Sequence, residues 1–336
     1  MDNNKLWIQQ TIAHQETQKI PYNFDFSPPA QAAVAKYYRT ENIEEKLNLP
    51  IRMADVKSIK PIYADPDEHG PVIRDEFGVI WSTNKIDRGA PIGPCLSNPS
   101  LTDYVFPDPK EEYRYEGIGN WCNHNAHHFT LIWVGDLWER ATFMRGMNDL
   151  LLDTAVNINF VEVLIKRIAD YIMQTMKILF ERFKFDCIAL SDDYGSQKTM
   201  LMSPRTWRNL VKPCLSDIFR LAKENSRYIF LHSCGNIEPI IPDLIDIGLD
   251  ILHPVQPEAM DPFEIKKKYG DDLTFCGGIG TQRLLPYGTT DEIRRKIREL
   301  KDIMGQGGGY IIEPGITIQS DVPLANVIAM IDEVVA

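Results

Sequence analysis

Several features are missing from the sequence, and each absence excludes a class of protein. No run of about 18 apolar residues occurs, so no transmembrane helix is predicted. The first residues, MDNNKLWIQQ, lack a basic segment followed by an apolar core, so no signal peptide is expected. The six cysteines show no C-x-x-C spacing, and in a chain without export signals they are expected to be reduced thiols in the cytoplasm.

Positive charge is also scarce. The 336 residues carry a formal net charge of -11, and no basic cluster stands out. Such a chain is a poor partner for nucleic acid, because the phosphate backbone attracts basic surfaces. The composition is otherwise that of a globular protein, with 44% hydrophobic residues, so the expected ligands are small molecules or other proteins.

The chain divides into an irregular part and a regular part within one predicted domain, residues 1–336. Residues 1–125 are rich in proline and aromatics, and the stretch 71–82 is predicted to be a β-hairpin with its turn near Phe77 and Gly78. Residues 127–336 alternate short apolar segments with amphipathic ones, which is typical of βα units around a parallel sheet. The predicted strands are 127–135, 185–193, 228–235, 250–256, 273–280 and 309–314.

A (β/α)8 barrel explains this pattern best. There are too many βα units for a small open sheet, and no glycine-rich dinucleotide fingerprint follows the first strand. Residues 20–26 are the candidate first strand, and the hairpin is an insertion. A long helix is expected from Asp153 to Lys184, one begins at Ser203, and Thr289 and Glu292 form a capping box before another.

In such a barrel the chemistry gathers at the carboxyl ends of the strands. Polar residues recur at these ends in unit after unit: Asp192, Asp193, His232, Cys234, His253, Gln256, Cys276 and Glu313. The two aspartates alternate faces, so one of them is expected to point into the barrel mouth. The alternative interpretations are a capping carboxylate at these aspartates and a backbone-bonded imidazole at His253.

The segment YIFLHSCG brings two soft-metal ligands together. His232 and Cys234 are two residues apart and therefore project from the same side of an extended chain. With Cys276 from another strand, and with Glu313 or Glu139 as a carboxylate, they would suit zinc, which favours nitrogen and sulfur ligands. A histidine with its hydrogen bonds satisfied beside an inert buried thiol is the alternative.

Three segments resemble the uroporphyrinogen decarboxylase superfamily, whose fold is a (β/α)8 barrel. They are FLHSCGNIEPIIPDLIDIGLDILHPVQ, DLTFCGGIGTQRLLPYGTTDEIRRKI and GGGYIIEPGITIQSDVPLANVIAMID. The resemblance covers residues 127–336 well and the N-terminal part loosely. The superfamily contains decarboxylases and corrinoid-linked methyltransferases, and the stretches 135–146 and 191–207 look like the methyltransferase members.

The resemblance implies a zinc site built on the H-x-C pair. In the cobamide:coenzyme M methyltransferases a later cysteine completes the set, but this sequence has Ile316 at the matching place. Cys276 or Glu313 would then replace it, or the metal is absent. The arginine-rich motif of the decarboxylases has no counterpart in residues 20–31, which disfavours an anionic tetrapyrrole as substrate.

The resemblance thus implies a methyltransferase of the O-demethylase type, which moves a methyl group from a methoxylated aromatic to the Co(I) corrinoid (cobalamin) of a separate protein. Asp192 or Asp193 would position or protonate the leaving oxygen. The expected substrate contacts are Phe24, Trp121, Phe129, Tyr194, Gln256 and Gln282. A decarboxylase and a non-catalytic corrinoid- or tetrapyrrole-binding protein are the alternatives, and a homodimer is left open.

Overall fold

The computed structural model describes residues 4–336, so the first three residues of the predicted domain 1–336 lie outside it. Its centre is a seven-stranded parallel sheet with the order β1-β5-β6-β7-β8-β9-β10. The strands are β1 (Ile51–Asp55), β5 (Phe129–Gly135), β6 (Cys187–Ser191), β7 (Tyr228–His232), β8 (Ile251–Val255), β9 (Thr274–Ile279) and β10 (Tyr310–Pro314). All six strands predicted in residues 127–336 are present.

The sheet wraps around a core of its own. One cluster of buried side chains contains residues from every strand of the sheet, including Ile51 of β1 and Ile311 of β10 at its two edges. Residues 20–26 continue the sheet beyond β10 through two parallel bridges, Tyr22 to Ile312 and Phe26 to Ile318. The predicted (β/α)8 barrel is therefore confirmed, with residues 20–26 in the place of its first strand.

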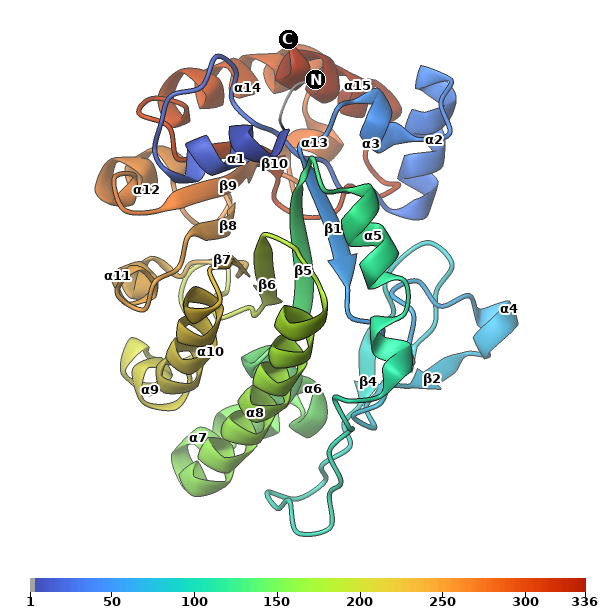
Figure 1. Ribbon diagram of the computed structural model, residues 1–336, viewed down its shortest axis with the longest axis vertical. Coiled ribbons are helices and arrows are strands. Elements are labelled where there is room, and N and C mark those ends of the chain that lie inside the picture. The colour runs from blue at the N-terminus through green and yellow to red at the C-terminus, as the bar shows by residue number, and fades with distance from the viewer. Residues whose placement is uncertain (1–3) are drawn as a thin grey trace.

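Helices cover the outside of the barrel (Figure 1). The amphipathic ones with buried apolar faces are α8 (Ile158–Arg182), α10 (Lys212–Glu224), α14 (Thr290–Met304) and α15 (Leu324–Val335). The capping box of Thr289 and Glu292 is present at the start of α14. Ser203 caps α9 (Pro204–Leu210) by accepting a hydrogen bond from the Thr206 amide.

The single long helix expected from Asp153 to Lys184 is wrong in one respect. The structure has two helices, α7 (Met147–Val156) and α8, which are separated at Asn157. The Asn157 backbone leaves the helical region (φ -134°, ψ 44°), and its side-chain amide donates to Asp153 Oδ1 at 2.7 Å. The apolar periodicity continues across this break, so the sequence pattern does not reveal it.

The predicted hairpin is confirmed as part of a small insertion. β2 (Val72–Arg74) pairs antiparallel with β3 (Ile80–Ser82), and β4 (Pro91–Gly93) adds a third strand. Arg140 of α6 (Trp138–Arg145) ties this insertion to the barrel, because it contacts Asp75 of the hairpin turn and Asp136 after β5, each at 2.9 Å. The insertion consequently lies beside the carboxyl ends of the strands.

The remaining elements are short. They are α1 (Asn4–Ile12), α2 (Pro28–Tyr38), α3 (Ile43–Lys46), α4 (Pro66–His69), η1 (Glu112–Tyr115), α5 (Ile118–His124), η2 (Glu238–Ile240), α11 (Ile241–Asp246), α12 (Pro262–Tyr269) and α13 (Leu284–Tyr287). Ile8 of α1 joins the core inside the barrel. Within residues 4–336, no helix has both the length and the apolar character needed to cross a membrane.

Candidate functional site

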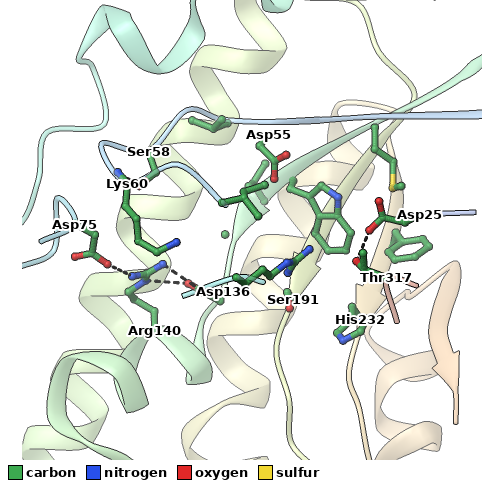
Figure 2. Close-up of a pocket in the computed structure, with 18 of the residues that line it drawn as sticks. Asp25, Asp55, Ser58, Lys60, Asp75, Asp136, Arg140, Ser191, His232 and Thr317 are labelled. Carbon is green, nitrogen blue, oxygen red and sulfur yellow. Dashed lines mark hydrogen bonds and ion pairs between the residues drawn. The ribbon is translucent and has the colours of Figure 1, made fainter. Parts of the chain in front are cut away.

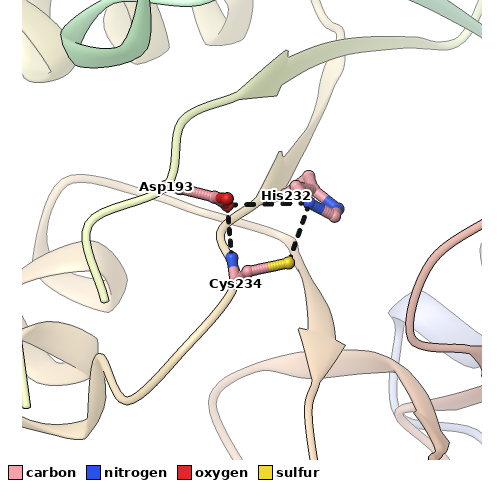
Figure 3. Close-up of side chains that lie close together, drawn as sticks. All are labelled: Asp193, His232 and Cys234. Atoms are coloured by element: carbon pink, nitrogen blue, oxygen red, sulfur yellow. Dashed lines mark hydrogen bonds and ion pairs between the residues drawn. The ribbon is translucent and has the colours of Figure 1, made fainter. Parts of the chain in front are cut away.

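Three side chains with metal-binding atoms meet at the mouth of the barrel (Figure 3). His232 is the last residue of β7, Cys234 follows two residues later, and Asp193 lies two residues beyond the end of β6. The Cys234 Sγ is 3.3 Å from His232 Nε2, and Asp193 Oδ1 is 3.7 Å from the same nitrogen. One ligand atom from each residue lies within 4.8 Å of the others, which defines the candidate metal triad.

Backbone contacts between two loops place these side chains. The Asp192 amide donates to the carbonyl of His232 at 2.8 Å, so the ladder between β6 and β7 continues past the strand end. The Cys234 amide then donates to Asp193 Oδ1 at 2.6 Å. The carboxylate of Asp193 is therefore fixed beside the thiol by a charge-assisted hydrogen bond.

Two glycines allow the loops to approach this closely. Gly235 has a φ of +82°, and a Cβ atom there would lie 2.3 Å from the carbonyl carbon of Gly195. A Cβ atom on Gly195 would lie 2.7 Å from the Asn236 amide nitrogen. Glycine is needed at both positions because the two backbones are in direct contact.

His253 orients the imidazole of the triad. His232 Nδ1 is 2.8 Å from His253 Nδ1, and His253 Nε2 is 3.5 Å from the Pro314 carbonyl oxygen. We assign the His253 proton to Nε2, which faces the carbonyl acceptor, so that His253 Nδ1 accepts a hydrogen bond from the protonated Nδ1 of His232. His232 Nε2 then keeps a free lone pair directed at Cys234 and Asp193, which is the tautomer that a metal requires.

The electrostatics of the triad suit a bound cation. Burial, with a smaller contribution from Arg88, lowers the pKa of His232 to about 4, so the imidazole is neutral at pH 7. Burial raises the pKa of the Cys234 thiol and of Asp193, and the neighbouring carboxylates Asp193 and Glu139 raise the thiol pKa further. A bound divalent cation would lower the pKa values of Cys234 and Asp193, because it favours thiolate and carboxylate ligands. The residues present therefore fit zinc.

Glu139 adds a carboxyl group next to the triad. It comes from α6, and its Oε2 accepts a hydrogen bond from the Ser191 hydroxyl at 3.2 Å. Burial, and then the charge of Asp193, raises the pKa of Glu139 well above its usual value. Burial and the Asp193 charge therefore both favour the protonated form of Glu139.

Of the two adjacent aspartates, only Asp193 belongs to the triad. Asp192 is fully buried, and its Oδ2 accepts from the Tyr194 hydroxyl at 2.5 Å, while its Oδ1 accepts from the Glu139 amide at 2.8 Å. Burial raises the pKa of Asp192 to about 7. The structure thus gives Asp192 and Tyr194 a role in holding the start of α6 rather than in contacting substrate.

Cys276 and Glu313, expected as zinc ligands, form a separate pair. The Cys276 thiol donates to Glu313 Oε2 at 2.8 Å, and the Asn23 amide donates to Glu313 Oε1 at 2.7 Å. Cys276 is the third of six residues in β9, so its side chain points into the closed core below the mouth. Asp193 takes the place beside His232 and Cys234 that was predicted for these two residues.

A cavity of about 690 Å³ opens next to the triad (Figure 2). His232, His253, Glu313 and Ser191 line one side of it, and residues of the insertion line the other. Gln256 and Gln282 instead line a second cavity of about 110 Å³, which also borders Cys234 and Ile316. The first cavity has the size of a small-molecule site.

The four aromatic residues expected to contact substrate lie outside both cavities. Phe129 is fully buried in the barrel core, Tyr194 packs edge-on against Trp207, Phe24 packs between Tyr22 and Phe26, and Trp121 packs on the outer core. The aromatic lining of the large cavity is Tyr63, Phe77, Trp81, Trp133, Tyr171 and Phe230.

Sequence reasoning missed most of the cavity lining. Asp55 lies at the carboxyl end of β1 and would have been found if 51–55 had been recognised as a strand. Lys60, Trp81 and Arg88 come from the irregular N-terminal part, where no periodic pattern indicates which side chains face the barrel.

Comparison with known proteins identifies the family. A model of the uroporphyrinogen decarboxylase (URO-D) family matches residues 134–336, which is more than half of the chain. A methylcobamide:CoM methyltransferase, MtaA, of Methanosarcina barkeri is 30% identical over 146 residues, 44% of this chain and 40% of the relative. A methylated-thiol–coenzyme M methyltransferase of Methanosarcina mazei is 24% identical over 252 residues, 69% of this chain and 63% of the relative.

Among solved structures, a methyltransferase from Methanosarcina mazei matches over 98% of both chains with a TM-score of 0.72 and 17% sequence identity. That likeness establishes the same fold. The alignment with MtaA spans about two fifths of that relative's length, and it is the family match that assigns this chain. The chain belongs to the uroporphyrinogen decarboxylase family.

Proposed function

We propose that the protein is a corrinoid-dependent methyltransferase that takes a methyl group from a methoxylated aromatic and transfers it to the Co(I) corrinoid of a separate protein. The single observation that carries the proposal is the triad of Asp193, His232 and Cys234, whose His232 lines the large cavity. The two relatives named above, which act on methylcobamide and on methylated thiols by name, support this class of reaction.

Zinc is the proposed metal of the triad. Asp193, His232 and Cys234 supply oxygen, nitrogen and sulfur, and three protein ligands leave one position of a tetrahedral site open. When bound, zinc supplies a Lewis acid that polarises the oxygen or sulfur to which the methyl group is attached. His253 keeps the imidazole in the ligating tautomer, as its contact of 2.8 Å with His232 indicates.

The reaction breaks the bond between the methyl carbon and the ether oxygen. The electron pair of that bond stays on the oxygen, the methyl group passes to the Co(I) acceptor, and the phenolate takes up a proton. The walls of the cavity hold the donor so that the methyl carbon faces the open mouth, where the acceptor approaches. Glu139, whose pKa is raised first by burial and then by the charge of Asp193, is the proposed proton donor at its Oε atoms.

The test uses the purified full-length protein with free cob(I)alamin as methyl acceptor. The cobalt absorbance change is followed with a methoxylated aromatic as donor, with and without added zinc. We expect conversion of cob(I)alamin only in the presence of protein and donor, and faster conversion with zinc. Conversion of uroporphyrinogen to coproporphyrinogen without methyl transfer would instead identify a decarboxylase, and corrinoid binding without either reaction would identify a binding protein.

A further inference from the structure

The large cavity contains four cationic side chains, and two of them already have anionic partners. Arg140 contacts Asp75 and Asp136, each at 2.9 Å. Arg114 contacts Glu76 at 2.8 Å. The ion pairs of these two arginines hold the insertion together and attach it to the barrel. Their charges are therefore already balanced by carboxylates of the protein.

Lys60 has no carboxylate partner. Its ammonium group donates to the Pro61 carbonyl oxygen at 3.1 Å and lies 4.6 Å from the centre of the Trp81 ring. It forms no ion pair with any carboxylate in residues 4–336. Burial lowers the pKa of Lys60; the charges of Asp75 and Glu76 oppose that shift, and the charges of Arg88 and Arg140 add to it. Figure 2 shows the side chain directed into the cavity beside Arg140.

Arg88 is the second cation that forms no ion pair within the described chain. It belongs to the segment between β3 and β4 and lines the same cavity as His232. Its field acts on three neighbours, because it lowers the pKa of His232 and opposes the upward shifts of Asp55 and Tyr63. Arg88 is therefore a residue of the insertion whose charge reaches the triad across the cavity.

The carboxylates on the opposite wall offset these cations only in part. Asp25 accepts a hydrogen bond from the Thr317 hydroxyl, and Glu313 is occupied by Asn23 and Cys276. Burial raises the pKa of both Asp55 and Glu313, which favours their neutral forms. The positive charges of Lys60 and Arg88 are therefore available to an anion that binds against their wall of the cavity.

We infer that Lys60 and Arg88 form an anion-binding subsite for the carboxylate of an aromatic methyl donor, a methoxybenzoate rather than an uncharged methoxybenzene. The inference rests on the proposed function and deepens it. A carboxylate gives both cations the partner that the protein lacks, and it does so inside a cavity where charge-assisted hydrogen bonds are strong. The indole of Trp81, next to Lys60, offers a face for the aromatic ring.

Ligand binding to the full-length protein tests the subsite without any methyl transfer. Titration calorimetry compares 3-methoxybenzoate with methoxybenzene, which has the same ring and methyl group but no carboxylate. We expect 3-methoxybenzoate to bind at least about tenfold more tightly, in line with a hydrogen-bonded charge pair. Equal affinity for the two probes would overturn the inference.

Variants then assign the effect to the two cations. Lys60→Met and Arg88→Gln are each expected to weaken 3-methoxybenzoate about tenfold and to leave methoxybenzene unchanged. Lys60→Arg should retain most of the affinity. Lys85→Met is the matched control, because Lys85 lies in the same insertion but is paired with Asp65 and Asp67 outside the cavity. A loss in Lys85→Met equal to that in Lys60→Met would contradict the assignment.

A transfer assay separates this inference from the proposed function. Methyl transfer from both probes with equal kcat/KM would leave the proposed function standing and refute the subsite. Selective binding of 3-methoxybenzoate without methyl transfer from any donor would support the subsite and refute the proposed function. Selective binding together with selective transfer would support both.

Discussion

Two corners of the barrel hold a thiol beside a carboxylate, and they differ in depth. Cys234 and Asp193 lie two residues beyond the ends of β7 and β6, and Cys234 borders the smaller cavity. Cys276 lies inside β9, and its thiol is enclosed with Glu313 and Asn23. The thiol therefore borders a cavity at one corner, whereas at the other it is enclosed and only its carboxylate partner Glu313 lines the large cavity, according to the offset of each cysteine from the strand end.

The largest expected difference between the corners concerns zinc and activity. Cys234→Ala should lose bound zinc and lower methyl transfer at least about 100-fold, because it removes a ligand while leaving the barrel core untouched. Cys276→Ala should keep its zinc and most of its activity. Metal analysis of the purified variants, with the melting temperature as a check of folding, measures both. Zinc retained in Cys234→Ala and lost in Cys276→Ala would reverse the comparison.

A second prediction concerns stability at the closed corner. Burial raises the pKa of Glu313 from 4.5 to about 7, so the folded state binds its proton more tightly than the unfolded state does. This group therefore makes the protein less stable as pH rises from about 4.5 to 7, by up to ~3 kcal/mol. Glu313→Gln should remove that part of the slope.

Urea unfolding at pH 5 and pH 8 measures the effect as a difference between wild type and variant. Asp192, whose pKa is also raised to about 7, contributes a slope of the same sign to both proteins, so the difference isolates Glu313. Glu299→Gln, at an exposed position on α14, is the control and should leave the slope unchanged. An identical pH dependence in wild type and Glu313→Gln would refute the prediction.

The smallest expected effect concerns the support of the open corner. His253→Phe keeps an aromatic ring but removes the acceptor for His232 Nδ1, so the imidazole is less firmly oriented. We expect zinc affinity to fall by about tenfold, as for other partners of metal-ligating histidines. A competition titration with a chelator measures the change. Unaltered affinity would show that His232 needs no such support.

The barrel could be predicted because each buried parallel strand is apolar throughout and ends in polar residues. The same rule identified His232, Cys234 and the aspartate pair, and alternation of faces indicated that one aspartate would point into the mouth. It did not apply to Cys276, because the predicted strand 273–280 itself continues past the cysteine, which is therefore not at a strand end. In the structure β9 extends three residues further, to Ile279.

The cavity wall opposite the triad was beyond the reach of sequence reasoning. Lys60, Trp81 and Arg88 face the cavity because Arg140 holds the insertion against the barrel through Asp75 and Asp136. That contact joins residues far apart in the chain, and no local pattern encodes it. The prediction that Phe129 and Tyr194 contact the substrate does not match the structure, because both side chains are fully buried in the core.

The contact between Gly195 and Gly235 has a consequence for how the triad is assembled. The two loops are in main-chain contact at these glycines, and the hydrogen bond from the Cys234 amide to Asp193 Oδ1 holds the two ligand residues together before any ion binds. The separation of these two metal-binding residues is thus fixed in the folded protein. Replacing either glycine by alanine would push the two loops apart and increase that separation.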